Sequence, residues 1–266
     1  MLADKIEKLN IARFTGKEKS RIEDLVVWER PLTIILNNRE LATLLCWPTD
    51  QKFLAVGFLY SEGLINSKDD IKKITVDEKR GVVRVKTEVD NELAGEQVFS
   101  RFITSGCGRG TSFYSPFDVR DMARVESQTR LLPEEVFDLM KAFHRRSKVY
   151  RKTRGVHSAA LCDTRDILLF AEDIGRHNAI DKIFGQCLLE DLPTDEHVLV
   201  TSGRISSEIL LKVARKAIPI VISKSAPSDI GVKLADELGI TIIGYVRGQR
   251  MNVYTHEWRV VIDEQK

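Results

Sequence analysis

One pattern repeats along the last hundred residues of the chain: a short β-branched run, a loop of small residues, and an amphipathic stretch. The runs at 167–170, 197–201 and 218–223 are each followed by such a loop and by apolar residues at helical spacing, and a fourth run covers 240–246. Strands and helices in this alternation predict an α/β fold with a mainly parallel sheet covered on both faces. Ligands bind such sheets beyond the carboxyl ends of the strands, so these loops are the first place to look for a site.

The first hundred residues have a different pattern. Apolar strands are predicted around a turn at Asn37 and Asn38, then a helix between Asp50 and Gly63, then further strands within 71–103. We therefore predict a smaller N-terminal α+β domain over 21–103, a flexible loop over 104–117, and a C-terminal α/β domain over 118–266. Two helices, at 118–130 and 133–147, are expected to open the second domain.

Charge and hydropathy restrict the class of protein. The 266 residues include 41 basic and 39 acidic side chains, a net charge of +2, which argues against a disordered chain and against general nucleic-acid binding. The longest apolar runs, such as 34–36 and 218–222, are far shorter than the roughly 20 residues of a membrane-spanning helix. The amino terminus lacks the apolar core of a secretion signal, so we expect a cytoplasmic protein with no membrane contact.

The four cysteines are expected to be free thiols. Cys46, Cys107, Cys162 and Cys187 are separated by 61, 55 and 25 residues, with no close pair. Cys107 differs from the others because glycine stands on both sides of it and Arg109, two residues on, favours the thiolate. It is either a mobile nucleophile that carries a group between two places or an incidental cysteine in a hinge, whereas the other three lie in apolar stretches and are expected to pack.

The loops after two of the predicted strands have the chemistry of an anion site. Ser202, Gly203 and Arg204 stand between a strand and a helix, where free backbone amides and an arginine can hold a phosphate. A serine-capped turn explains the same residues without a ligand. A similar loop at 225–228 and two further arginines, Arg247 and Arg250, favour a crevice for a pyrophosphate.

A run of polar residues from 172 to 182 contains Asp173, His177 and Asp181 at spacings of four, so that one helical stripe would carry acid, imidazole and acid. Such a stripe is either the floor of a polar pocket or an ordinary surface helix with paired charges. His157 is either a core histidine or part of a pocket wall.

A zinc-dependent deaminase is improbable, and no metal site is expected. Its metal site needs a glutamate two residues after a histidine or cysteine and a later Pro-Cys-x-x-Cys, but Ala159 stands two residues after His157 and the second motif does not occur.

Several segments together resemble the FdhD family of formate dehydrogenase accessory sulfurtransferases, over nearly all of the chain from about Glu29. The matching segments are 29–32, 57–63, Ser-Gly-Cys-Gly at 105–108, Glu-Asp-Ile-Gly-Arg-His-Asn-Ala-Ile-Asp-Lys at 172–182, 202–204 and 225–227. The long polar run is the most specific of them.

The resemblance implies a cytidine-deaminase-like second domain, a homodimer, and a cytoplasmic role in maturing a molybdenum enzyme. It implies that Cys107 accepts sulfur from a cysteine desulfurase as a persulfide and passes it to the bis-molybdopterin guanine dinucleotide of formate dehydrogenase. The residues expected to bind this cofactor are Arg176, His177, Asn178, Ser202, Gly203, Arg204, Tyr245, Val246, Arg247, Gly248, Gln249 and Arg250.

This sequence departs from the family at one place. Many members carry Cys-x-x-Cys in the loop, whereas here Gly110 stands three residues after Cys107. One thiol must therefore suffice, or a second must come from elsewhere. The alternative function is a non-covalent cofactor chaperone, in which Cys107 carries no sulfur.

Overall fold

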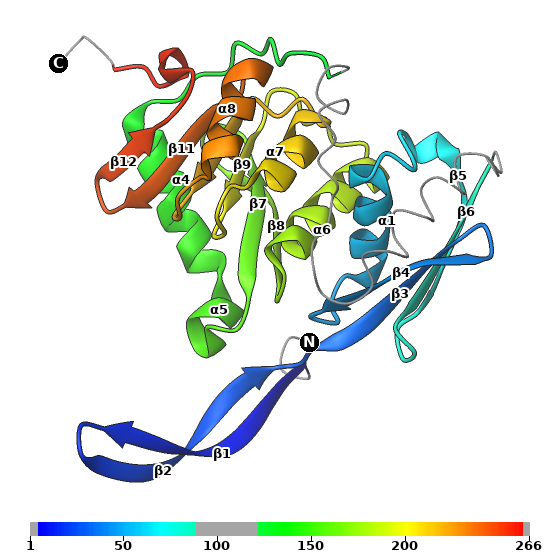
Figure 1. Cartoon of the computed structure of the whole chain (residues 1–266), viewed down its shortest axis with the longest axis vertical. Coiled ribbons are helices and arrows are strands. Elements are labelled where there is room, and N and C mark those ends of the chain that lie inside the picture. Colours follow the sequence, from blue (N-terminus) through cyan, green and yellow to red (C-terminus); the bar gives the residue numbers. More distant parts are fainter. Residues whose placement is uncertain (1–4, 89–121, 263–266) are drawn as a thin grey trace.

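The computed structural model describes residues 5–88 and 122–262, and within them the chain forms three β-sheets (Figure 1). The first is a hairpin of β1 (Ile6–Thr15) and β2 (Glu18–Val27), which projects from the rest of the molecule. The turn contains Gly16 at a φ of 62°, where glycine is unstrained. The sequence prediction began its first domain at residue 21 and missed most of this hairpin, whose side chains are largely exposed and polar.

A four-stranded sheet follows, in the order β4-β3-β6-β5. Its strands are β3 (Arg30–Leu36), β4 (Arg39–Cys46), β5 (Ile71–Asp77) and β6 (Val82–Thr87), with a short 3-10 turn η2 (Lys68–Asp70) before β5. The predicted turn at Asn37 and Asn38 is confirmed: both residues have positive φ, which a two-residue hairpin requires. Helix α1 (Gln51–Ser61) covers one face of this sheet and contributes Leu54 and Phe58 to its core.

The second half contains a six-stranded sheet in the order β12-β11-β10-β9-β7-β8. Its strands are β7 (His157–Cys162), β8 (Ile167–Asp173), β9 (Val198–Thr201), β10 (Ile220–Ser223), β11 (Thr241–Arg247) and β12 (Arg250–Val253). Only β9, β10 and β11 pair in parallel, so the prediction of a mainly parallel sheet was wrong at its two sides. Short turns join β7 to β8 and β11 to β12, and a short turn can only return a strand antiparallel.

Helices cover both faces of this sheet, as the alternating pattern predicted. Helices α6 (Arg176–Leu189), α7 (Ser207–Ala214) and α8 (Asp229–Leu238) pack on one face, and α4 (Pro133–Arg146) packs on the other. A short helix α5 (Lys148–Thr153) leads into β7, and a 3-10 turn η3 (Glu257–Arg259) lies near the end of the chain. The mixed α/β class is confirmed, while the cytidine-deaminase likeness stays a prediction.

The helix predicted at 118–130 is not present over 122–130, and the rest of that range lies outside the described residues. This segment is extended because tertiary hydrogen bonds hold its backbone. The amide of Val125 donates to the carbonyl of Leu238 at 2.8 Å, and the buried Arg259 donates to the carbonyl of Ser127 at 3.0 Å. Such contacts override a local preference for helix.

The two halves of the molecule meet where α1 crosses α6 (Figure 1). A Cβ atom on Gly57 would lie 1.7 Å from the carbonyl oxygen of Asp181, and one on Gly185 would lie 2.0 Å from that of Phe53. The helices are therefore so close that only glycine fits at these two positions. The loop predicted at 104–117 lies outside the described residues, so the proposed domain boundary stays a prediction.

Candidate functional site

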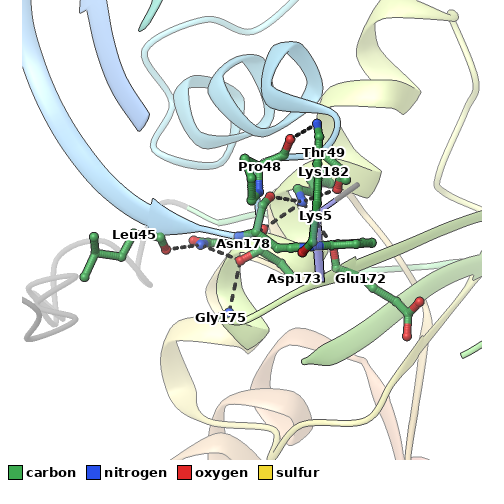
Figure 2. A network of polar contacts seen from close by, with 10 residues as sticks. Lys5, Leu45, Pro48, Thr49, Glu172, Asp173, Gly175, Asn178 and Lys182 are labelled. Carbon is green, nitrogen blue, oxygen red and sulfur yellow. Dashed lines mark hydrogen bonds and ion pairs between the residues drawn. The ribbon is translucent and has the colours of Figure 1, made fainter. Parts of the chain in front are cut away.

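The polar run at 172–182 is divided between a strand and a helix. Strand β8 ends at Asp173 and helix α6 begins at Arg176, so Asp173, His177 and Asp181 do not form one helical stripe as predicted. Asp173 is fully buried and lies 2.7 Å from the ammonium of Lys182, which is 1% exposed (Figure 2). A carboxylate with no exposure needs such a partner.

This buried ion pair joins the two halves of the chain. Asp173 also accepts hydrogen bonds from the backbone amide of Trp47 at 3.2 Å and from the Asn178 side chain at 2.9 Å. Lys182 donates to the carbonyl of Trp47 and to the hydroxyl of Thr49, each at 3.1 Å (Figure 2). This part of the polar run therefore forms a buried connection inside the protein. The charged groups of Asp173 and Lys182 are bound to each other and to other protein groups, which leaves them no role in binding a ligand.

A second bridge is centred on Asp181, which directly precedes Lys182 on α6. The ammonium of Lys212 is 2.7 and 2.8 Å from the two oxygens of Asp181 and 3.7 Å from Glu62. The hydroxyl of Ser61 donates to Asp181 at 2.6 Å. Burial raises the pKa of Glu62. Glu62 and Ser61 come from the first half and Lys212 from α7, so sequence spacing alone did not predict this cluster.

The carboxyl ends of the parallel strands form the polar edge expected of a ligand site. The hydroxyl of Ser202, directly after β9, lies 3.2 Å from the ring nitrogen Nδ1 of His157 and accepts a hydrogen bond from the backbone amide of Ser158 at 3.0 Å. The hydroxyl of Ser225, after β10, donates to the carbonyl of Ser202 at 3.0 Å. The backbone amide of Tyr245, on β11, donates to the carbonyl of Ser225 at 3.2 Å. The structure therefore brings three strand ends together and places His157 beside the site.

Arg176 carries the clearest sign of a missing partner at this edge. Its side chain lies against Gly203, where an added Cβ would be 2.9 Å from the arginine Cβ. Its Nε is buried and has no hydrogen-bond partner among the described residues, and the same holds for the hydroxyl of Ser206 at the start of α7. A buried donor without an acceptor is costly, and a bound anion would supply the acceptor.

His177 is half-buried next to this edge. Its Nε2 lies 3.3 Å from a carboxylate oxygen of Glu208, a partner that the sequence analysis missed. Burial, with help from the nearby cations Lys212 and Arg176, lowers the pKa of His177 to about 3. The imidazole is therefore neutral at pH 7, and its contact with Glu208 is not an ion pair at that pH.

The remaining predicted ligand residues lie at different depths. Asn178 points inward and donates to the carbonyl of Leu45 at 2.9 Å, and Val246 is buried in the core on the α4 side of the sheet. The side chains of Arg204, Arg247 and Arg250 are exposed, as are Gly248 and Gln249 in the turn between β11 and β12.

Tyr245 has a strained backbone at the edge. Its φ is 55°, a value that non-glycine residues rarely adopt, and the β11–β12 pairing shifts register at this point. The guanidinium of Arg247 lies 5.5 Å from the centre of the exposed Tyr245 ring. Strain of this kind occurs often at functional sites.

Three of the four cysteines are poor candidates for thiol chemistry. Cys46, Cys162 and Cys187 are buried, and burial raises the pKa of each thiol to about 12. A thiol at this pKa is almost entirely protonated at neutral pH and is a weak nucleophile. Cys107 lies outside the described residues.

The described residues show no other centre of this kind. Within 5–88 and 122–262, no group of three or more His, Cys, Asp or Glu side chains is placed to hold a metal ion. In the same part of the chain, no helix is long and apolar enough to cross a membrane.

Together, these features define an α/β protein whose mixed sheet carries a polar, arginine-bearing edge and whose three described thiols are all buried. Comparison with known proteins gives the family. The model of the FdhD/NarQ family matches residues 27–261, and the chain belongs to this family.

The similar proteins cover nearly the whole chain. The sequence is 45% identical over 251 residues to the sulfur carrier protein FdhD of Bacillus subtilis (strain 168), a match that covers 94% of this chain and 96% of the relative. It is 44% identical over 237 residues to the sulfur carrier protein FdhD of Bacillus pumilus (strain SAFR-032), covering 89% and 90%. The crystal structure of a "putative formate dehydrogenase accessory protein" from Desulfotalea psychrophila is 26% identical, with a TM-score of 0.82, and the match covers 97% of this chain and 100% of that one.

Proposed function

We propose that this protein is a cytoplasmic, homodimeric sulfur carrier that serves a formate dehydrogenase. Cys107 accepts sulfur from a cysteine desulfurase as a persulfide and passes it to bis-molybdopterin guanine dinucleotide, which is bound as a substrate. The observation that carries the proposal is the state of the other thiols. The relatives are named sulfur carriers, and the three described cysteines are buried with a pKa of about 12, so sulfur chemistry falls to Cys107.

The polar edge of the six-stranded sheet supports the second half of the proposal. A guanine dinucleotide carries pyrophosphate groups, and the unpartnered Nε of Arg176 and hydroxyl of Ser206 are donors suited to phosphate oxygens. Ser202 and Gly203 lie at the same edge, where Gly203 leaves room for the Arg176 side chain, and Arg204, Arg247 and Arg250 add exposed positive charge. His177, neutral at pH 7, would act as a hydrogen-bonding group and not as a cation.

Sulfur loading tests the role of Cys107. The wild-type protein, incubated with a cysteine desulfurase and L-cysteine, is expected to gain sulfur on the peptide that contains Cys107, as measured by mass spectrometry. Cys107→Ser is expected to abolish this gain, because a hydroxyl cannot form a persulfide. Cys46→Ser, Cys162→Ser and Cys187→Ser are the matched controls and are expected to load normally, provided that each remains folded.

The competing function predicts a different pattern. If wild-type protein never gains sulfur on Cys107 and still binds guanosine diphosphate, the chain is a cofactor chaperone without covalent chemistry. Sulfur found on one of the buried cysteines would contradict the assignment of the thiol.

The nucleotide site is tested with guanosine diphosphate. Arg176→Ala, Arg247→Ala and Arg250→Ala are each expected to weaken its binding by roughly tenfold or more, since a hydrogen bond from a charged group contributes about 1.5 to 3 kcal/mol. Isothermal titration calorimetry measures the change. Arg165→Ala, in the exposed turn between β7 and β8, is the control and is expected to bind normally. Equal binding by all four variants would place the nucleotide elsewhere.

A further inference from the structure

A dense block of positive charge lies in the second half of the chain. Residues 141–154 contain seven lysines and arginines and no acidic residue. The whole chain has a net charge of only +2, and +2 minus +7 leaves −5 for all other residues. The molecule is therefore strongly polarised although its total charge is small.

The structure exposes all of this charge. Lys141, Arg145 and Arg146 lie on the last turns of α4, and Lys148, Arg151, Lys152 and Arg154 lie on or directly after α5. All seven are exposed, while Phe143 and Val149 beneath them are buried and hold both helices to the body. Among the described residues, none of the seven forms an ion pair.

An eighth cation joins the block from the sheet. Lys224 follows β10 at the edge that carries Ser202 and Ser225, and its side chain is exposed. Partial burial is the largest cause that lowers the pKa of His144, and the positive charges of Lys224, Arg151 and Arg154 lower it further. These three cations therefore lie near His144. We call Lys224 and the seven cations of 141–154 the α4–α5 basic surface.

Helix dipoles do not account for this arrangement. Cations near the ends of α4 and α5 do stabilise those ends, by about 0.3 to 1 kcal/mol each at an exposed position, and only within the last turn. Two or three cations are enough to stabilise the ends of both helices. The others add mutual repulsion without an acidic partner among the described residues, and Lys224 belongs to neither helix.

The shape of the surface favours a protein over a small ligand. All eight cations are exposed and come from two helices and the end of a strand, whereas a nucleotide is held in a pocket with a few converging donors. An opposed acidic surface on a protein matches a broad, exposed block of this kind.

We propose that the α4–α5 basic surface docks an acidic surface of the protein that receives the cofactor. The proposal rests on the proposed function, in which the ligand leaves from the carboxyl edge of the six-stranded sheet and enters a formate dehydrogenase. Lys224 stands at that edge, so the receiving protein meets the basic surface as it approaches the ligand. Attraction between opposite charges over this area speeds and orients the encounter.

The test uses the full chain and formate dehydrogenase purified without its cofactor. The variant Arg151→Glu/Arg154→Glu/Lys224→Glu reverses three charges around His144. Its binding, measured by biolayer interferometry at about 50 mM salt, is expected to be roughly tenfold or more weaker than wild type, and the difference is expected to shrink at about 0.5 M salt because salt screens exposed charges.

A matched variant controls for total charge. Lys73→Glu/Arg84→Glu/Lys86→Glu reverses three exposed cations on β5 and β6 of the four-stranded sheet and is expected to bind like wild type. Thermal unfolding by circular dichroism checks that both variants are folded. If the first variant is not folded, Arg151→Gln/Arg154→Gln/Lys224→Gln replaces it. This variant is expected to show a smaller loss of binding.

Three outcomes overturn the proposal: unchanged binding by the first variant, an equal loss with the control variant, or a parallel loss of guanosine diphosphate binding. The last would assign these cations to the nucleotide. Failure of the proposed function gives a separate signal, because wild-type protein would then neither gain sulfur on Cys107 nor bind guanosine diphosphate, whatever the docking assay shows.

Discussion

Replacing Gly57 by alanine is expected to destabilise the whole molecule. The new methyl group would stand 1.7 Å from the carbonyl oxygen of Asp181 and 2.7 Å from the amide nitrogen of Gly185, both of them backbone atoms that cannot rotate away. Helices α1 and α6 would have to separate, and overpacking of this kind costs about 3 kcal/mol or more. For a chain of this size the loss corresponds to a fall in melting temperature of roughly 6 to 12 °C.

Calorimetric melting of the variant and of two companions makes the test specific. Gly185→Ala places its methyl group 2.0 Å from the carbonyl oxygen of Phe53 and is expected to behave in the same way. Lys52→Ala changes an exposed residue of α1 and is expected to leave the melting temperature unchanged. A normal melting temperature for Gly57→Ala would show that the helices lie further apart than the structure places them.

The second large effect is expected from Lys182→Met. This change leaves the carboxylate of Asp173 fully buried without its cation and removes the hydrogen bonds to Trp47 and Thr49. Removing one partner of a buried ion pair costs about 3 to 5 kcal/mol. Urea unfolding of the purified variant measures the loss.

A double-variant cycle separates charge from packing. Asp173→Asn/Lys182→Met is expected to be more stable than Lys182→Met alone, because no unpaired charge is then buried. Lys8→Met is the comparison, since Lys8 and Glu23 form an ion pair at 2.8 Å on the exposed hairpin, and no measurable change is expected there. If Lys182→Met is as stable as wild type, the ion pair is not what joins these segments.

The fold was predictable where the spacing of apolar residues was regular. The strands and helices from β8 to β11, and the turn at Asn37 and Asn38, follow from periodicity and turn chemistry. The helix predicted at 118–130 fails over 122–130, because contacts with Leu238 and Arg259, more than a hundred residues away, decide the conformation of that segment. The β1–β2 hairpin escaped prediction because its side chains give no clear apolar face.

The location of the site was predictable from the sequence, but the pairing of its charged side chains was not. Strand ends and small-residue loops pointed to Ser202 and Gly203, and the structure places Arg176 beside them. Spacing alone also put Asp173 and Asp181 on one helical stripe, as either a pocket floor or a surface helix with paired charges. Their actual partner cations are Lys182 and Lys212, and Lys212 lies 31 residues beyond Asp181 on another helix. Only a tertiary structure shows whether a buried carboxylate is free for a ligand or already paired.

The crossing of α1 and α6 limits how a transfer reaction can proceed in this molecule. Close glycine contacts and two lysine–carboxylate clusters fasten the four-stranded part to the six-stranded part. A rotation of one part about the other would break both clusters, whose central aspartates and lysines are buried. Whatever brings a sulfur donor and its acceptor together must therefore use other elements of the chain, and neither part is expected to persist as a stable fragment after a cut between them.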